Sequence, residues 1–211
     1  MAQDLTALAV AVVGVAGTMA APWLAQLARR SELRLEAERA DRTRRQDRDA
    51  AEFERRRERY AALNEYARTF RTSTLDVAHA LRRGESVPAA TWEALAGARE
   101  AYRAEYAQAQ MILPEATLDI VSEVSRCLSH GYQLVRSAAA SADPRAASAQ
   151  AVAWLENPLS DGVWLLRRAL REDLGVTEAT HDLPQRAAGL RSARRAQAAT
   201  VPRLPQGRDA G

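Results

Sequence analysis

The chain contains no lysine, and all 30 of its basic residues are arginine. Its single cysteine, Cys127, excludes an internal disulfide framework and fits a reducing compartment. The sequence has no Gly-rich phosphate loop, no His-Glu-x-x-His, no paired-cysteine motif and no nucleophile elbow. We therefore expect no catalytic, cofactor-binding or metal-ligating residues, no cofactor and no enzymatic activity.

The longest uncharged segment lies near the N-terminus. Residues 5–28 form a run of 24 residues without a charge. As a helix rising about 1.5 Å per residue, this run reaches roughly 36 Å, enough to cross a hydrocarbon core of about 30 Å. The sequence predicts a single membrane-spanning helix within residues 1–28, with the lipid bilayer as its partner.

Two other interpretations of this segment stay open. A cleaved signal peptide fits the Thr18-Met19-Ala20 string, but the chain begins Met-Ala-Gln-Asp without a basic residue before the apolar run. A buried soluble helix fits poorly because the segment lacks a polar face. With the membrane interpretation, Arg29, Arg30 and Arg34 directly after the span place the N-terminus outside and the rest in the cytoplasm, at the plasma (inner) membrane.

Residues 29–59 carry 12 arginines and 9 acidic residues and have neither glycine nor proline. Acid-to-arginine pairs four residues apart, such as Glu38–Arg42 and Glu52–Arg56, favour a helix. The heptad positions counted back from Tyr60 are mostly charged, so a tight coiled coil is not expected. We predict a solvated, charged helical stalk; a disordered polyampholyte is the alternative.

Residues 60–175 show the helical spacing of apolar residues that is typical of a packed bundle. Gly84, Pro114 and the Ser141–Pro144 turn divide this region into four segments, and Asn157-Pro158 predicts a kink or a split in the fourth. The apolar stripes of the four segments are Tyr60, Leu63, Ala67, Phe70, Thr74, Val77 and Leu81; Trp92, Leu95, Tyr102, Tyr106, Ala109 and Leu113; Leu118, Val121, Val124, Leu128, Tyr132 and Val135; and Val152, Leu155, Leu159, Val163, Leu166 and Leu170.

The predicted fold class is therefore all-α. A transmembrane helix and a charged helix precede an antiparallel up-down bundle of about four helices. Residues 176–211 contain three prolines, six arginines and three acidic residues, which predicts a disordered basic tail, with a short helix near 185–198 as the alternative.

The histidines, the cysteine and the tyrosines Tyr102 and Tyr106 are each expected to have a structural role. His79, His130 and His181 lie far apart in sequence and off the apolar stripes, so we expect surface or boundary positions. Cys127 is expected to be a small core or boundary hydrophobe. Tyr102 and Tyr106 with the neighbouring arginines could stack bases, but they lie in a region with more acids than arginines, so nucleic acid is not expected as a partner.

The most distinctive parts of the sequence are the N-terminal apolar run and three strings: YAALNEYARTFR (60–71), EAYRAEYAQAQMILP (100–114) and VWLLRRALREDLG (163–175). The chain resembles uncharacterised membrane-anchored helical proteins of actinobacteria over most of residues 5–175. The resemblance implies one N-terminal span and a cytoplasmic helical bundle, without an activity or site residues.

The function expected from these patterns is a membrane-tethered protein-interaction or scaffold protein, with a protein partner or self-association. The alternative is a helical sensor or effector domain that binds a small ligand in the bundle core. The basic tail is expected to be solvated. Contact with anionic lipid and weak, nonspecific contact with nucleic acid stay open as alternatives for the tail.

Overall fold

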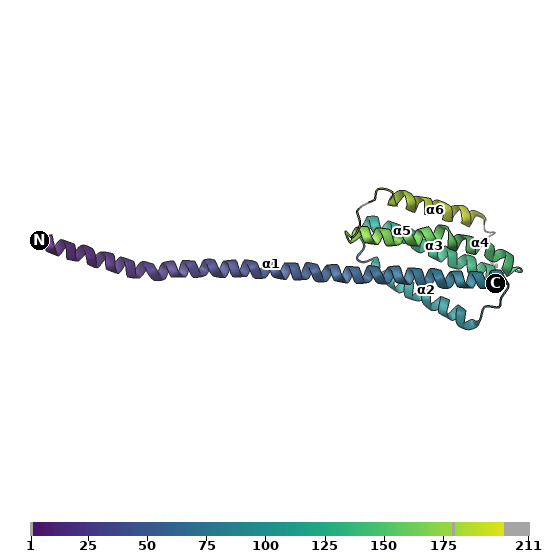
Figure 1. The fold of residues 1–211 in the computed structure, drawn as a ribbon, viewed down its shortest axis with the longest axis horizontal. Helices are drawn as coiled ribbons and strands as arrows, with labels where there is room; N and C mark the ends of the chain where they lie inside the picture. Colours follow the sequence, from purple (N-terminus) through teal and green to yellow (C-terminus); the bar gives the residue numbers. More distant parts are fainter. Residues whose placement is uncertain (1, 179, 201–211) are drawn as a thin grey trace, which may run out of the picture. The chain divides into compact units, whose positions relative to one another are not determined.

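The computed structural model describes residues 2–178 and 180–200, and this part of the chain consists of helices joined by turns, without a strand (Figure 1). The all-α prediction is confirmed. The helices are α1 (Ala2–Arg83), α2 (Ala89–Ala109), α3 (Glu115–Ala139), α4 (Pro144–Glu156), α5 (Pro158–Asp173) and α6 (Leu183–Thr200).

Proline, glycine and aspartate lie at the helix boundaries, among them Gly84 and Pro114, where the sequence predicts a boundary. Gly84, after α1, and Gly175, after α5, have φ values of 77° and 67°, a left-handed conformation that favours glycine. Pro88 and Pro114 precede α2 and α3. The Asp143 carboxylate accepts a hydrogen bond from the Ala146 amide at 3.0 Å and caps α4.

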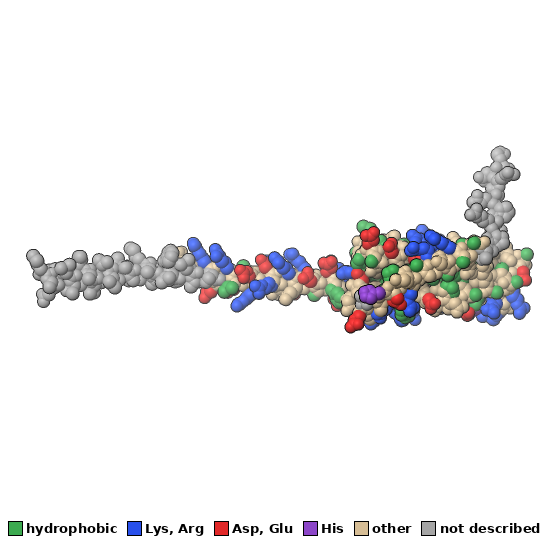
Figure 2. Space-filling view, turned by 90° about the horizontal axis from the view of Figure 1, so that it is seen from above, with side chains coloured by type: hydrophobic (Ala, Val, Ile, Leu, Met, Phe, Trp, Pro, Cys, Tyr) green, Lys and Arg blue, Asp and Glu red, His purple; other side chains and the backbone are tan. Residues whose placement is uncertain are grey.

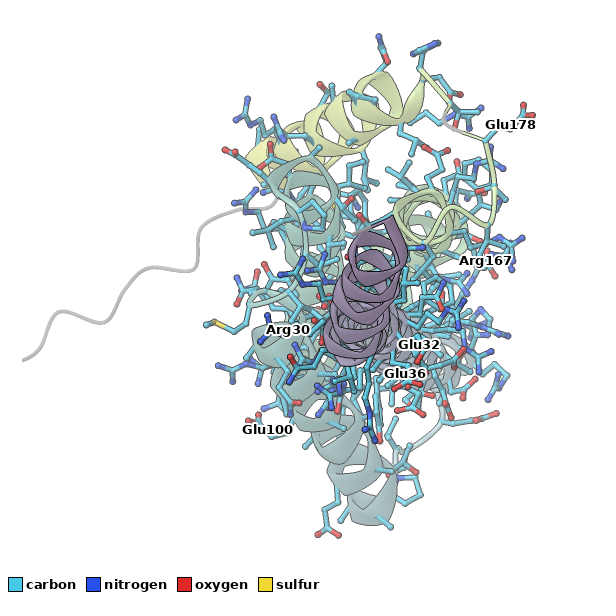
Figure 3. All side chains as sticks on the ribbon, turned by 90° about the vertical axis from the view of Figure 1, so that its left-hand side faces the viewer. Arg30, Glu32, Glu36, Glu100, Arg167 and Glu178 are labelled. Atoms are coloured by element: carbon cyan, nitrogen blue, oxygen red, sulfur yellow. The ribbon has the colours of Figure 1, made fainter. Side chains whose placement is uncertain are left out.

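The chain divides into two compact units, residues 1–53 and 54–211. In the first unit, every described side chain from Arg29 to Phe53 is exposed, including Leu33 at 59%. Figure 2 shows basic and acidic side chains following one another along this part of α1, and Figure 3 shows Arg30 and Glu32 on opposite sides of the helix. The predicted helical stalk is therefore a helix that buries no side chain among those described.

No helix in the described part of the chain is both long enough and apolar enough to cross a membrane. The side chains of residues 1–25, 27 and 28 lie outside the described residues. They make up nearly all of the apolar run, so the span predicted for residues 5–28 stays a prediction.

In the second unit, the end of α1 and the helices α2 to α6 enclose one main apolar core. All seven residues of the predicted α1 stripe, from Tyr60 to Leu81, are buried. The stripes of α2 to α5 also face the core, although Trp92, Tyr106, Leu118 and Tyr132 are only partly buried. Val163 of the fourth stripe is partly buried as well but does not belong to the core, so its predicted core position is wrong.

The bundle has more helices than the predicted four. Asn157, with φ −105° and ψ −82°, leaves the helical conformation, and Pro158 then begins α5. The split therefore occurs where the sequence predicts a kink or a split. α4 and α5 both pack on α3.

The prediction of a disordered tail is wrong for residues 183–200, which form α6 and pack on α3 and α5. The physical reason is a short apolar stripe: Leu183, Ala187 and Leu190 are spaced four and three apart, and all are buried. The alternative of a helix near 185–198 is confirmed. Residues 201–211 lie outside the described part of the chain.

Candidate functional site

A buried carboxylate lies at the contact of α3 with α6. Glu123, in the third turn of α3, has a relative exposure of 0%. A carboxylate is seldom fully buried unless it is paired, because removing a charge from water is costly. The Glu123 carboxylate therefore requires partners of opposite charge.

Three guanidinium groups surround this carboxylate. Arg194 Nε donates to Glu123 Oε1 at 2.8 Å, and Arg191 Nε donates to Oε2 at 3.2 Å; both arginines belong to α6. Arg126 Nη1, from the next turn of α3, donates to Oε2 at 3.2 Å. Arg191 and Arg194 are three residues apart, a spacing that places them on the same face of α6. We call Glu123, Arg126, Arg191 and Arg194 the glutamate cluster.

The cluster keeps Glu123 ionised. Burial raises the pKa of the Glu123 carboxyl, but the hydrogen bonds from Arg194 and Arg191, the charge of Arg194 and the hydrogen bond from Arg126 oppose it, so the pKa lies below its usual value. The arginine side chains are 22%, 41% and 58% exposed for Arg194, Arg191 and Arg126, so their outer atoms remain in contact with water. The arrangement fits an ionic tie between two helices.

Cys127, His130 and Trp154 lie next to the cluster. The Cys127 thiol points at Glu123 Oε1 with an S–O distance of 3.8 Å, and Trp154 Nε1 donates to the Cys127 carbonyl at 3.2 Å. The His130 ring meets Trp154 edge to face, with centroids 5.0 Å apart. Helix α4 reaches this point because α3 has Gly131 there: an added Cβ would lie 2.9 Å from Leu155 and 3.2 Å from Trp154.

This environment holds the thiol and the imidazole neutral. Burial, with the charge of Glu123, raises the pKa of Cys127 to about 12. Burial, with the charge of Arg194, lowers the pKa of His130. A neutral buried thiol is a poor nucleophile. Cys127 is 0% exposed, which confirms its expected place in the core.

The other residues considered in the sequence analysis, His79, His181 and Tyr102, do not belong to the glutamate cluster. His79 Nε2 lies 3.2 Å from Glu156 Oε1 at the surface, and His181 is exposed. Tyr102 is 1% exposed, so its ring is not available to stack a base. Among the described residues, no group of three His, Cys, Asp or Glu side chains could hold a metal ion.

A second ionic group ties α1 to the end of α5. Tyr60 donates its hydroxyl to Asp173 Oδ2 at 2.6 Å, and Arg56 Nη2 donates to the same oxygen at 2.7 Å. Burial and the hydrogen bond to Asp173 raise the pKa of Tyr60 to about 12. This group fixes the start of the buried part of α1.

Comparison of the chain with protein-family models, curated proteins and solved structures gives no match.

Proposed function

We propose that the chain is a membrane-tethered interaction or scaffold protein whose bundle, residues 54–200, is displayed in the cytoplasm. The observation that carries the proposal is the exposure of the described side chains in the first unit, residues 1–53. A helix whose described side chains from Arg29 to Phe53 are all exposed contributes nothing to a core, and a tether needs no core.

The anchor in this proposal is the apolar run at residues 5–28. Its 24 uncharged residues suit a hydrocarbon core in length, and the arginines after it favour a cytoplasmic C-terminal side.

The bundle suits contact with a protein better than contact with nucleic acid. Three of the four α6 arginines have partners of their own: Arg191 and Arg194 pair with Glu123, and Arg186 pairs with Asp182 at 2.6 Å. Paired arginines attract phosphates less strongly than unpaired ones. Large apolar side chains are exposed instead, among them Met111 at 84%, Trp164 at 41% and Tyr66 at 37%. Exposed aromatic residues are enriched where proteins contact each other.

Site-specific photocrosslinking in cells tests the proposal. A photoreactive amino acid is placed, one position at a time, at Tyr66, Met111 and Trp164 on the bundle and at Leu35 on the first unit as the matched exposed control. We expect at least one bundle position to give a discrete crosslinked protein, either another chain or a second copy, that the Leu35 position does not give. A uniform smear or no product from all three bundle positions would contradict an interaction role.

A further inference from the structure

A cavity of about 380 Å³ lies between α5 and α6. Its walls are largely apolar and come from Trp164 and Leu165 of α5 and from Leu190 and Ala193 of α6. The volume falls in the lower part of the range of ligand-binding pockets, about 300–1,000 Å³. The space suits one bicyclic ring system.

Two glycines on opposite walls shape this cavity. At Gly162 of α5, an added Cβ would lie 3.1 Å from Leu190, so glycine permits the close approach of α6. At Gly189 of α6, an added Cβ would meet nothing within 4 Å, so the space beside it is open. The cavity therefore exists because α6 lies close to α5 at Gly162 and has no side chain at Gly189.

The rim of the cavity is polar and carries one paired charge, Arg186, and one charge without a partner among the described residues, Asp161. Arg186 lies over the Trp164 ring, with 5.0 Å from its guanidinium carbon to the ring centroid, and it is also paired with Asp182. Asp161 lines the rim and is exposed, and no side chain in the described ranges pairs with its carboxylate. Asn157 uses its Nδ2 to donate to the Ala153 carbonyl, which leaves its side-chain oxygen as an acceptor. The rim therefore offers acceptors and a negative charge to a ligand.

We propose that this α5–α6 cavity binds a small molecule that combines an aromatic ring system with a protonated amine. The ring would occupy the space beside Gly189 and contact the exposed face of Trp164, because aromatic rings gain from offset stacking. The ammonium group would lie at the rim and donate to the Asp161 carboxylate, a charge-assisted hydrogen bond. The ligand would thus touch both α5 and α6.

Calorimetric titration of the full-length chain tests the proposal with three probes that share one ring: naphthylmethylamine, naphthylmethanol and naphthoate. We expect the amine to bind about three- to fivefold more tightly than the alcohol, because an exposed ion pair contributes up to about 1 kcal/mol, which is about fivefold. Naphthoate should bind most weakly. Equal affinities for the three probes, tightest binding of naphthoate, or no binding of any probe would overturn the proposal.

Variants locate the binding. Gly189→Leu fills the cavity and should weaken binding of the amine by tenfold or more. Gly97→Leu is the matched control, because Gly97 is also an exposed helical glycine, on α2, with nothing within 4 Å of an added Cβ. Asp161→Asn should remove the preference for the amine over the alcohol. If Gly189→Leu lowers the melting temperature, Trp164→Ala supplies the second occupancy test, and unchanged affinity in the folded variant refutes the proposed site.

Discussion

The replacement of Glu123 by glutamine tests whether the charge of Glu123 stabilises the contact between α3 and α6. The amide keeps the size of the carboxylate but removes the charge that Arg194, Arg191 and Arg126 share. The hydrogen bond to Arg194 is the least exposed of the three, and a bond to a charged group contributes about 1.5–3 kcal/mol. The two more exposed arginines each add at most about 1 kcal/mol. We therefore expect Glu123→Gln to lower the free energy of unfolding by about 2–4 kcal/mol in total at neutral pH.

The pH dependence gives this prediction a second, independent part. The pKa of Glu123 is lowered in the folded chain, so its stabilising contribution is complete above the ordinary value of 4.5. The contribution is lost as the pH falls through the lowered folded pKa, where the carboxylate takes up a proton in the folded state as well. The difference in stability between the parent chain and Glu123→Gln should therefore shrink in acid.

Urea unfolding of a chain that begins at Arg29, followed by tryptophan fluorescence, measures both parts. Asp119→Asn is the matched control, because Asp119 lies one turn earlier on α3 and is exposed. It should change the stability by no more than about 0.5 kcal/mol. A Glu123→Gln variant as stable as Asp119→Asn, or a loss of stability that stays constant down to acid pH, would refute the ionic tie.

Three further predictions follow from the anchor, the core and the thiol. The full-length chain should pellet with membranes and be released by detergent but not by high salt, and its presence in the supernatant without detergent would contradict the span at residues 5–28. Phe70→Ala and Leu128→Ala should each cost about 2–5 kcal/mol in thermal melts, because both side chains are at most 1% exposed, whereas Glu93→Gln on the exposed face of α2 should cost almost nothing. The Cys127 thiol should react with a thiol reagent only after the bundle unfolds, since it is buried with a pKa of about 12; rapid labelling of the folded chain would show that the thiol is accessible.

The bundle is the part of the fold that the sequence predicts best. Spacing of three and four between apolar residues is sufficient to find the buried face of α1 from Tyr60 to Leu81, because helix geometry alone places those residues on one side. Gly84 and Pro114 mark turns for reasons that are equally local. The tail is predicted less well, because its prolines and charges outweigh the three residues, Leu183, Ala187 and Leu190, that anchor α6.

The glutamate cluster is not predicted by the sequence, and the reason is distance along the chain. Glu123 and Arg194 are separated by 71 residues, and nothing local links them. Two signals were present nonetheless. Glu123 lies between buried Ile120 and buried Cys127 at helical spacing, and Arg191 and Arg194 border the apolar stripe of α6. A charge that lies on an apolar face needs a partner of opposite charge, and a basic helix with a short apolar stripe can supply one.

The pairing of α3 with α6 also has a consequence for the order in which the molecule is completed during translation. Helix α6 is synthesised after all the other helices of the bundle, so Glu123 leaves the ribosome well before Arg191 and Arg194 exist. Until they arrive, the carboxylate has Arg126 as its cluster partner and faces water where α6 will later lie. A chain that stops short of residue 191 therefore leaves the Glu123 carboxylate without its two partners from α6. Such a chain would present to chaperones and proteases a surface of α3 that α6 covers in the folded bundle.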